Sequence, residues 1–305
     1  SAMITGILVI LAYLSSFFSI IMFFYPTPAI ILAKRKGLKY ASLALVASDI
    51  IVSMFLGVQT GMMFLILYTP LAIALAYGIC NNDDANKTIL FGSAAYMISF
   101  VVLILFLNTI MGVNFVQQLS DMYNESIAMM KEMLTSMPGG LNNKSVQEMI
   151  KTYDEMGSMM TFVITNVFPA IIIVASVITS YINYLVASKF AKRFSIDIKQ
   201  HEGLSHFSFP KTFMIAMAGL LLLSFLFSIL KINVGAIQLN LFMIVFVAMF
   251  FQGFAVLKFY IEKSNMNKAF RTIILVMVLF MSAGLSQVLA VIGLIDLAID
   301  LRKLR

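Results

Sequence analysis

Charged residues are scarce in this chain. Asp, Glu, Lys and Arg make up only 11% of its 305 residues, whereas a soluble domain carries roughly 25%. Hydrophobic residues make up 61%, and the mean hydropathy is +0.97. A water-soluble fold of this size needs more polar surface, so the composition argues against a soluble enzyme and a disordered chain. Cys80 is the single cysteine, which argues against a disulfide scaffold.

The sequence also lacks the motifs of several enzyme classes. It contains no Walker A loop, no GxSxG, no HExxH and no paired cysteines. His201 and His206 would fall on different helix faces, so together with Glu202 they favour a solvated loop over a metal site. Asp49 has no second mid-span aspartate of the kind that an intramembrane aspartic protease needs. We therefore expect a protein that is not an enzyme, with no catalytic residues, no metal and no cofactor.

Long apolar runs fill most of the chain instead. A helix needs about 20 mostly apolar residues to cross a bilayer, and these runs are continuous rather than alternating. They predict an all-α, polytopic transmembrane helical bundle with about eight spans. The spans are Ile4–Leu32, Tyr40–Val58, Met62–Cys80, Ile89–Met111, Phe162–Ser188, Phe213–Leu230, Ala236–Tyr260 and Thr272–Leu297. Pro26 and Pro28 break the first run, which is either one kinked span or two short ones.

The distribution of Lys and Arg orients these spans in the cell membrane. Loops 34–39, 81–87, 189–211 and 258–271 hold 14 of the 21 basic residues, and the loops between them hold 4. The positive-inside rule places the first four loops in the cytoplasm and residues 113–160 outside. Because topology accounts for the net charge of +7, we expect no nucleic-acid partner. The basic tail falls outside in this count, so either its charges are tolerated there or the last run turns back.

Three regions follow from this topology: N-terminal transmembrane helices over 3–112, a hairpin over 113–160 and C-terminal transmembrane helices over 161–305. The hairpin is expected to hold two amphipathic helices, because apolar residues repeat there at helical spacing on both sides of Pro138. Its methionine-rich faces either pack on each other or lie in the lipid interface. In the other interpretation the hairpin is a lid or an adaptable docking surface, with Met130, Met133 and Met156 as the gating residues.

Polar residues inside the spans are candidates for ligand contacts, since such residues are costly in lipid and usually face the bundle interior. Asp49 in the second span is the clearest case, and the other candidates are Asn183, Tyr184 and Asn108. The alternative for each is a hydrogen bond that holds two helices together. The first span also carries small residues that favour close packing, either inside the bundle or against a partner subunit. These residues are Ala12, Ser15, Ser16 and Ser19.

Several stretches, taken in their order along the chain, resemble the YybS-like family of bacterial membrane proteins. They are residues 26–28 (PTP) before 34–39 (KRKGLK), 182–186 (INYLV) before 192–194 (KRF), 207–211 (FSFPK), and 293–296 (GLID) before 300–303 (DLRK). That family is distantly similar in fold to the S-components of energy-coupling-factor vitamin transporters. The resemblance implies an S-component-like core, a small ligand bound near the outer face, the hairpin as its gate, and the small residues of the first span as a docking surface.

We therefore expect an integral membrane protein of S-component-like fold that binds, translocates or senses a small, partly apolar ligand without an ATPase of its own. The alternative is a structural or regulatory scaffold in a bacterial cell-envelope complex. The expected partners are the lipid bilayer, a small-molecule ligand, and either a membrane partner subunit or a second copy of the chain.

Overall fold

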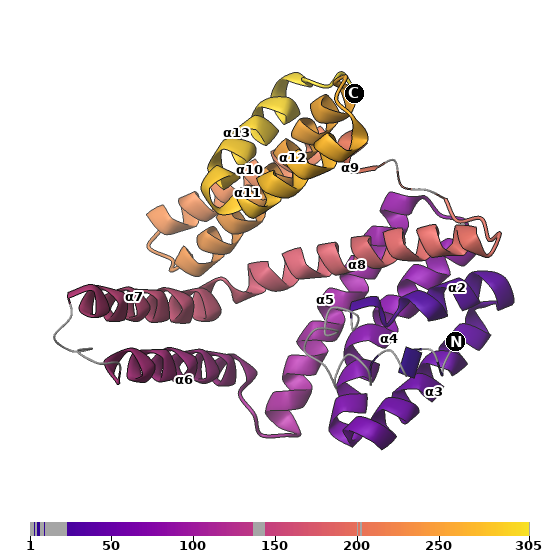
Figure 1. The fold of residues 1–305 in the computed structure, drawn as a ribbon, viewed down its shortest axis with the longest axis horizontal. Helices are drawn as coiled ribbons and strands as arrows, with labels where there is room; N and C mark the ends of the chain where they lie inside the picture. The colour runs from indigo at the N-terminus through magenta and orange to yellow at the C-terminus, as the bar shows by residue number, and fades with distance from the viewer. Residues whose placement is uncertain are drawn as a thin grey trace. The chain divides into compact units, whose positions relative to one another are not determined.

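The computed structural model describes residues 23–136, 144–199, 201 and 203–304, together with Met3, Thr5, Gly6 and Val9, apart from the side chains of residues 279, 280, 282 and 283. The chain divides into two compact units, Ser1–His201 and Glu202–Arg305. Within the described ranges every regular element is a helix (Figure 1). The all-helical prediction is therefore confirmed.

Six of the helices are long and apolar enough to cross a membrane, and they overlap six of the predicted spans. In the first unit these are α3 (Leu38–Leu56), α4 (Val58–Cys80), α5 (Ala85–Thr109) and α8 (Phe168–Arg193), and in the second α10 (Lys211–Ile229) and α11 (Gly235–Lys263). The count of about eight spans stays a prediction. Most of the run Ile4–Leu32 lies outside the described residues, and the run Thr272–Leu297 does not form one continuous helix.

Single glycines separate the first helices of the chain. Gly37 lies between α2 (Thr27–Lys36) and α3, and Gly57 lies between α3 and α4, with φ angles of +96° and +92°. Residues with a Cβ rarely adopt such angles, which explains glycine at both turns. The predicted loop 34–39 is wrong in extent, because its basic residues belong to the last turn of α2 and the start of α3. Cations at a helix C-terminus are stabilised by the helix dipole.

Small side chains let the long helices of the first unit approach closely. A Cβ on Gly92 of α5 would lie 2.4 Å from the Ser180 hydroxyl of α8. That hydroxyl donates a hydrogen bond to the Ile89 carbonyl at 2.7 Å. Where two helices lie this close, dispersion contacts and such hydrogen bonds replace the hydrophobic effect as the source of helix association in lipid.

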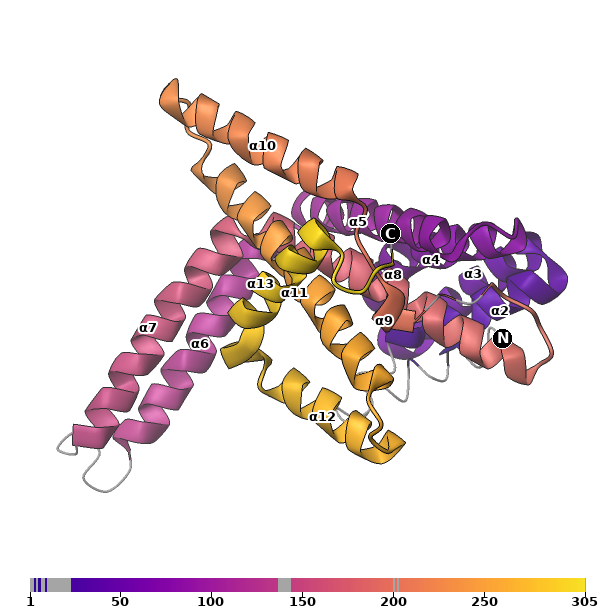
Figure 2. The same cartoon turned by 90° about the horizontal axis from the view of Figure 1, so that it is seen from above.

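The predicted hairpin is present as two helices, α6 (Phe115–Thr135) and α7 (Lys144–Asn166). They run side by side in opposite directions in both views (Figures 1 and 2). The Asn114 side chain caps α6 by accepting a hydrogen bond from the Gln117 N–H at 3.1 Å. The predicted break at Pro138–Gly140 lies outside the described residues.

In the second unit, α11 and α13 (Ser282–Ile299) touch backbone to backbone at two glycines. A Cβ on Gly253 would lie 1.8 Å from the Leu289 carbonyl oxygen, and a Cβ on Gly293 would lie 2.0 Å from the Met249 carbonyl oxygen. Both distances are far inside van der Waals contact, so only glycine fits at this point. Figure 2 shows α13 crossing α11 there.

A fully buried ion pair lies beside this crossing. The Arg302 guanidinium and the Asp296 carboxylate are 2.9 Å apart, and each side chain is 1% exposed. Gln252 donates to the same carboxylate at 2.7 Å, and Arg302 also donates to the carbonyls of Ser205 and Phe207 at 2.6 and 2.8 Å. Every charge in this cluster is therefore both paired and hydrogen-bonded, the condition under which burial of an ion pair is tolerated.

The last predicted span is interrupted. It forms α12 (Lys268–Phe280) and α13, which meet at Met281. The tail after α13 lies at one end of the unit, where α10 begins and α11 ends. There Tyr260, near the end of α11, donates a hydrogen bond to the Leu301 carbonyl at 3.0 Å, and Arg302 binds residues 205–207, just before α10. Of the two interpretations of the basic tail, this arrangement favours the one in which the last run turns back.

Cysteine labelling tests this return. In a Cys80→Ala background, Lys303→Cys and Lys263→Cys are expected to react with a membrane-impermeant thiol reagent from the same side, and Asn233→Cys, in the short α10–α11 connection, from the opposite side. All three positions are exposed. Labelling of Lys303→Cys together with Asn233→Cys would show instead that the last run crosses the membrane.

Removal of Arg302 tests the buried ion pair. Arg302→Ala leaves the Asp296 carboxylate buried without its counter-ion, and is expected to lower the free energy of unfolding by about 3–5 kcal/mol. Lys303→Ala, at the neighbouring exposed position, serves as the control. Thermal unfolding in detergent would measure both, and equal melting temperatures for the two variants would contradict the structural role of the pair.

Candidate functional site

Asp49 lies inside the first unit and is fully engaged by its own chain. It is 5% exposed. One carboxylate oxygen accepts a hydrogen bond from the Tyr25 hydroxyl, and the other accepts one from the Thr69 hydroxyl of α4 at 3.1 Å. The helix interface is tight at this level, because a Cβ on Gly61 would lie 2.9 Å from the Asp49 carbonyl oxygen. The carboxylate therefore joins α3 to α4 and to Tyr25, two residues before the start of α2.

Asn183 of α8 is also completely buried, and it binds the same segment of chain. Its amide nitrogen donates to the Phe23 carbonyl at 2.9 Å and to the Thr179 carbonyl at 2.9 Å. Its amide oxygen accepts a bond from the Thr27 hydroxyl at 3.4 Å. Two of the predicted site residues thus converge on residues 23–27, Asp49 through Tyr25 and Asn183 through Phe23 and Thr27.

The other two predicted ligand contacts lie elsewhere. Tyr184 is buried, and its hydroxyl donates to the Lys199 carbonyl at 2.7 Å, so it holds the segment that follows α8. Asn108 is exposed near the end of α5, where its side chain accepts a bond from the Phe115 N–H at 3.3 Å and so steadies the entry into α6. Neither residue contacts Asp49. The predicted docking residues Ala12, Ser15, Ser16 and Ser19 lie outside the described residues.

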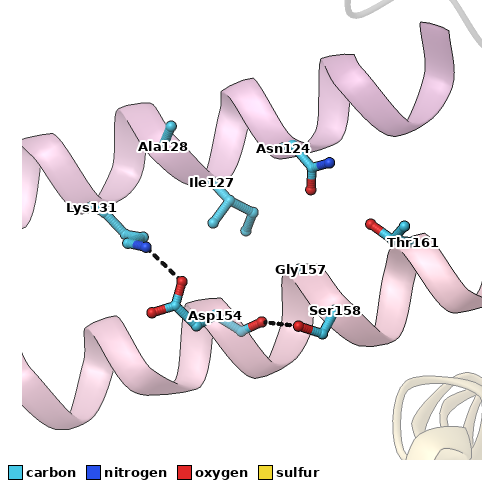
Figure 3. A pocket seen from close by; sticks show the side chains of 8 residues that line it. All are labelled: Asn124, Ile127, Ala128, Lys131, Asp154, Gly157, Ser158 and Thr161. Atoms are coloured by element: carbon cyan, nitrogen blue, oxygen red, sulfur yellow. Dashed lines mark hydrogen bonds and ion pairs between the residues drawn. The ribbon is translucent and has the colours of Figure 1, made fainter. Parts of the chain in front are cut away.

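A groove of about 410 Å³ lies between the two hairpin helices. Figure 3 shows it from close by. Its lining residues come from both helices: Asn124, Ile127, Ala128 and Lys131 from α6, and Asp154, Gly157, Ser158 and Thr161 from α7. An ion pair closes one end, with the Lys131 ammonium 2.5 Å from the Asp154 carboxylate. Gly157 leaves room on the opposite wall, because a Cβ there would meet only Asn124, at 4.0 Å.

The predicted gating methionines do not line this groove. Met130, Met133 and Met156 are between 46 and 66% exposed, and the two helices face each other instead through Ile127 and the polar residues of the groove. The methionine faces therefore do not pack on each other, and the lipid interface and the adaptable lid or docking surface stay as predictions for the hairpin. The reason is that Lys131, Asp154 and Gly157 occupy the inner faces, which turns the methionines outward.

A row of aromatic rings runs from Tyr25 to the base of the hairpin. Neighbouring ring centroids lie 5.2–6.4 Å apart, along Tyr25, Phe64, Tyr68, Tyr96, Phe100, Phe115 and Phe168. Phe115 begins α6 and Phe168 begins α8. The row therefore fills the space between the Asp49 environment and the point at which both hairpin connections enter the bundle.

Sequence reasoning missed the groove residues and the partners of Asp49. The groove residues did carry a signal, because Asn124, Ala128 and Lys131 recur at helical spacing on α6, and Asp154, Ser158 and Thr161 do so on α7. These residues form a second stripe on each helix, beside the methionine stripe, which the sequence could have indicated. No sequence signal pointed to Tyr25 and Thr69 as partners of Asp49, since they lie 24 and 20 positions away from it and only the fold brings them together.

The helices and their polar contacts define a multi-pass integral membrane protein, with six candidate spans among the described residues. The chain belongs to the family described as predicted membrane protein (DUF2232), whose model matches residues 3–297. It is 24% identical over 297 residues to the Uncharacterized protein YybS of Bacillus subtilis (strain 168), a match that covers 97% of this chain and 93% of that protein. The YybS-like family assignment is thereby confirmed. No solved structure matches the chain.

Substitution of Asn183 tests its role as an anchor of residues 23–27. Asn183→Ala removes a fully buried amide together with its hydrogen bonds to the Phe23 carbonyl and the buried Thr27 hydroxyl, and is expected to lower the free energy of unfolding by about 1–3 kcal/mol. Asn124→Ala, at an exposed position, is the matched control. Denaturant unfolding in mixed micelles would compare them, and an Asn183→Ala variant as stable as the control would contradict the anchor.

Proposed function

We propose that the protein is a non-enzymatic membrane protein that binds a small, partly apolar solute at its external hairpin, and that it translocates or senses this solute without an ATPase of its own. The groove between α6 and α7 carries the proposal. It is an open groove of about 410 Å³, lined by side chains of both helices.

The lining of the groove supports a solute that is partly apolar. Ile127 and Ala128 supply an apolar wall, while Lys131, Asp154 and Asn124 supply a cation, an anion and an amide. Small-molecule sites combine such an apolar surface with a few polar groups that fix the orientation of the ligand. A solute with one polar end would insert between the helices and compete with the Lys131–Asp154 ion pair for hydrogen bonds.

The exposed methionines fit the same proposal as a cover for the solute. Thioether side chains are flexible and polarisable, and they adapt to varied apolar shapes. Met130, Met133 and Met156 lie on the outside of the hairpin, where movement of one helix against the other would bring them over a bound molecule. The S-component-like architecture that the resemblance implies places such a gate on the outer face and a partner subunit on the membrane part.

Filling the groove tests the proposal. Gly157→Leu places a side chain in the groove without altering a charge, and is expected to abolish the thermal stabilisation that a bound solute confers. A panel of vitamins and nucleobases would be screened by thermal shift with the purified protein in detergent. Stabilisation follows the ratio of solute concentration to Kd, at about 2.7 kcal/mol for a hundredfold excess over Kd.

Thr152→Leu is the matched control, because Thr152 is exposed on the same helix and does not line the groove. It should keep the thermal shift that the wild type shows. A panel that shifts neither the wild type nor the control, or a Gly157→Leu variant that keeps the full shift, would rule out the groove as the binding site.

A scaffold role is the second candidate, and the contacts of Asp49 and Asn183 favour it. Both residues form their hydrogen bonds with other residues of the chain, as structural residues do. In this case the hairpin would contact another protein of the cell envelope. Crosslinking in native membranes from an exposed hairpin position such as Met133 separates the two roles, because a scaffold gives one stoichiometric protein adduct and a solute-binding protein gives none.

A further inference from the structure

Asp49 poses a problem that the proposed solute site does not address. The carboxylate lies within α3, eleven residues after Leu38, which is about 16 Å along the helix at 1.5 Å per residue. It is therefore near the middle of a hydrocarbon core about 30 Å thick, and it is 5% exposed. An ionised group in such a position is costly unless an opposite charge compensates it.

No basic side chain of the first unit compensates Asp49. Residues 1–22 contain no charged side chain at all. Each Lys, Arg and His between residues 23 and 201 lies in the described part of the unit, and none of them forms an ion pair with Asp49. Asp296 of the second unit shows the contrast, because Arg302 neutralises it at 2.9 Å.

The groups around Asp49 are hydroxyls and aromatic rings. Tyr25 and Thr69 donate to its two oxygens. Among the described elements packed around Asp49, the titratable neighbours are Tyr25, before α2, and Tyr68, on α4. The ring centroids of these two tyrosines are 6.0 Å apart. Both are phenols and neither carries a positive charge. Among the described residues of the first unit, the site therefore has hydrogen-bond partners for a carboxyl group in either protonation state, but no basic side chain in an ion pair with it.

The backbone beside Asp49 is also interrupted. α2 starts at Thr27, directly after a turn at Tyr25–Pro26, so the helix begins at the depth of the carboxylate and ends in the basic residues near Gly37. The start of a helix carries only a partial positive charge. The beginning of α2 therefore favours the ionised carboxylate, but it does not supply the full charge of a basic side chain.

We propose that Asp49 is a proton-binding site, with its buried carboxylate as the acceptor and the Tyr25 hydroxyl as the group that responds. The carboxylate takes a proton from hydronium, which leaves water and a neutral acid. The ionised form receives charge-assisted hydrogen bonds from Tyr25 and Thr69. The neutral form accepts more weakly and can itself donate to one hydroxyl. Protonation therefore loosens the tie between α3 and Tyr25, while Asn183 continues to hold Phe23 and Thr27.

Infrared difference spectroscopy in lipid nanodiscs tests the site directly. On acidification the wild type is expected to gain a carboxylic-acid carbonyl band. This band should shift only slowly in D₂O, because the acid proton is buried and exchanges slowly. Asp49→Asn should lose that band, since the amide reproduces the shape and hydrogen bonds of the neutral acid but cannot titrate. Asp121→Asn, which removes an exposed carboxylate of the hairpin, should keep it.

Tyr25→Phe gives an independent readout in case Asp49→Asn does not fold. It preserves the carboxylate and removes one donor, so both the frequency of the band and the midpoint of its titration should move. A band that is present in Asp49→Asn, or unchanged in frequency and midpoint in Tyr25→Phe, would overturn the proposal.

Sodium ions provide the last arm of the experiment. Replacing choline chloride by NaCl at fixed pH should leave the spectrum and the melting temperature of the wild type unchanged. If Na⁺ stabilises the wild type but not Asp49→Asn, and no slowly exchanging acid band is found, the site binds a metal cation and the proton assignment is wrong. None of these outcomes depends on the hairpin groove, so the proposed function is tested separately.

Discussion

Polar groups in a lipid-embedded helix have to find partners within the chain, since the hydrocarbon core offers none. Two buried aspartates show how differently this chain meets that requirement. Asp296 is neutralised by Arg302 and hydrogen-bonded by Gln252. Asp49 receives only hydroxyl donors, from Tyr25 and Thr69. The first arrangement fixes the tail against the rest of the second unit, whereas the second gives Asp49 hydroxyl donors and no ion pair among the described residues of the first unit.

This requirement also accounts for the interrupted helices. A helix that stops inside the bilayer exposes backbone groups, and these need side-chain partners. The Phe23 carbonyl, just before α2, receives the amide of Asn183. In the second unit, the guanidinium of Arg302 binds the Ser205 carbonyl in the short helix α9 (Gly203–His206) and the Phe207 carbonyl directly after it. In each unit a buried polar side chain thus satisfies an irregular segment, and its removal would leave backbone groups unpaired.

The apolar runs were sufficient to predict the long helices, because continuous hydrophobicity and helical length are local properties. Contacts between distant segments were not accessible in the same way. Asp49 could be singled out as a mid-span charge, but its partner Tyr25 is fixed by the packing of α2 and α3. The return of the last run was ambiguous for a related reason. Counting basic residues treats Arg302 as solvated, whereas in the structure Asp296 neutralises it.

The hairpin shows why an apolar stripe alone is a weak guide to which faces meet. Methionine is the most frequent apolar residue type there, yet the inner faces are formed by Ile127, Gly157 and an ion pair. Packing of two helices requires small or complementary residues at the contact, and methionine meets neither requirement as well as glycine. The methionines are consequently free for an external contact. The aromatic row ends at Phe115 and Phe168, where the hairpin joins the bundle. The row therefore forms a continuous packed path between the Asp49 environment and the base of the hairpin.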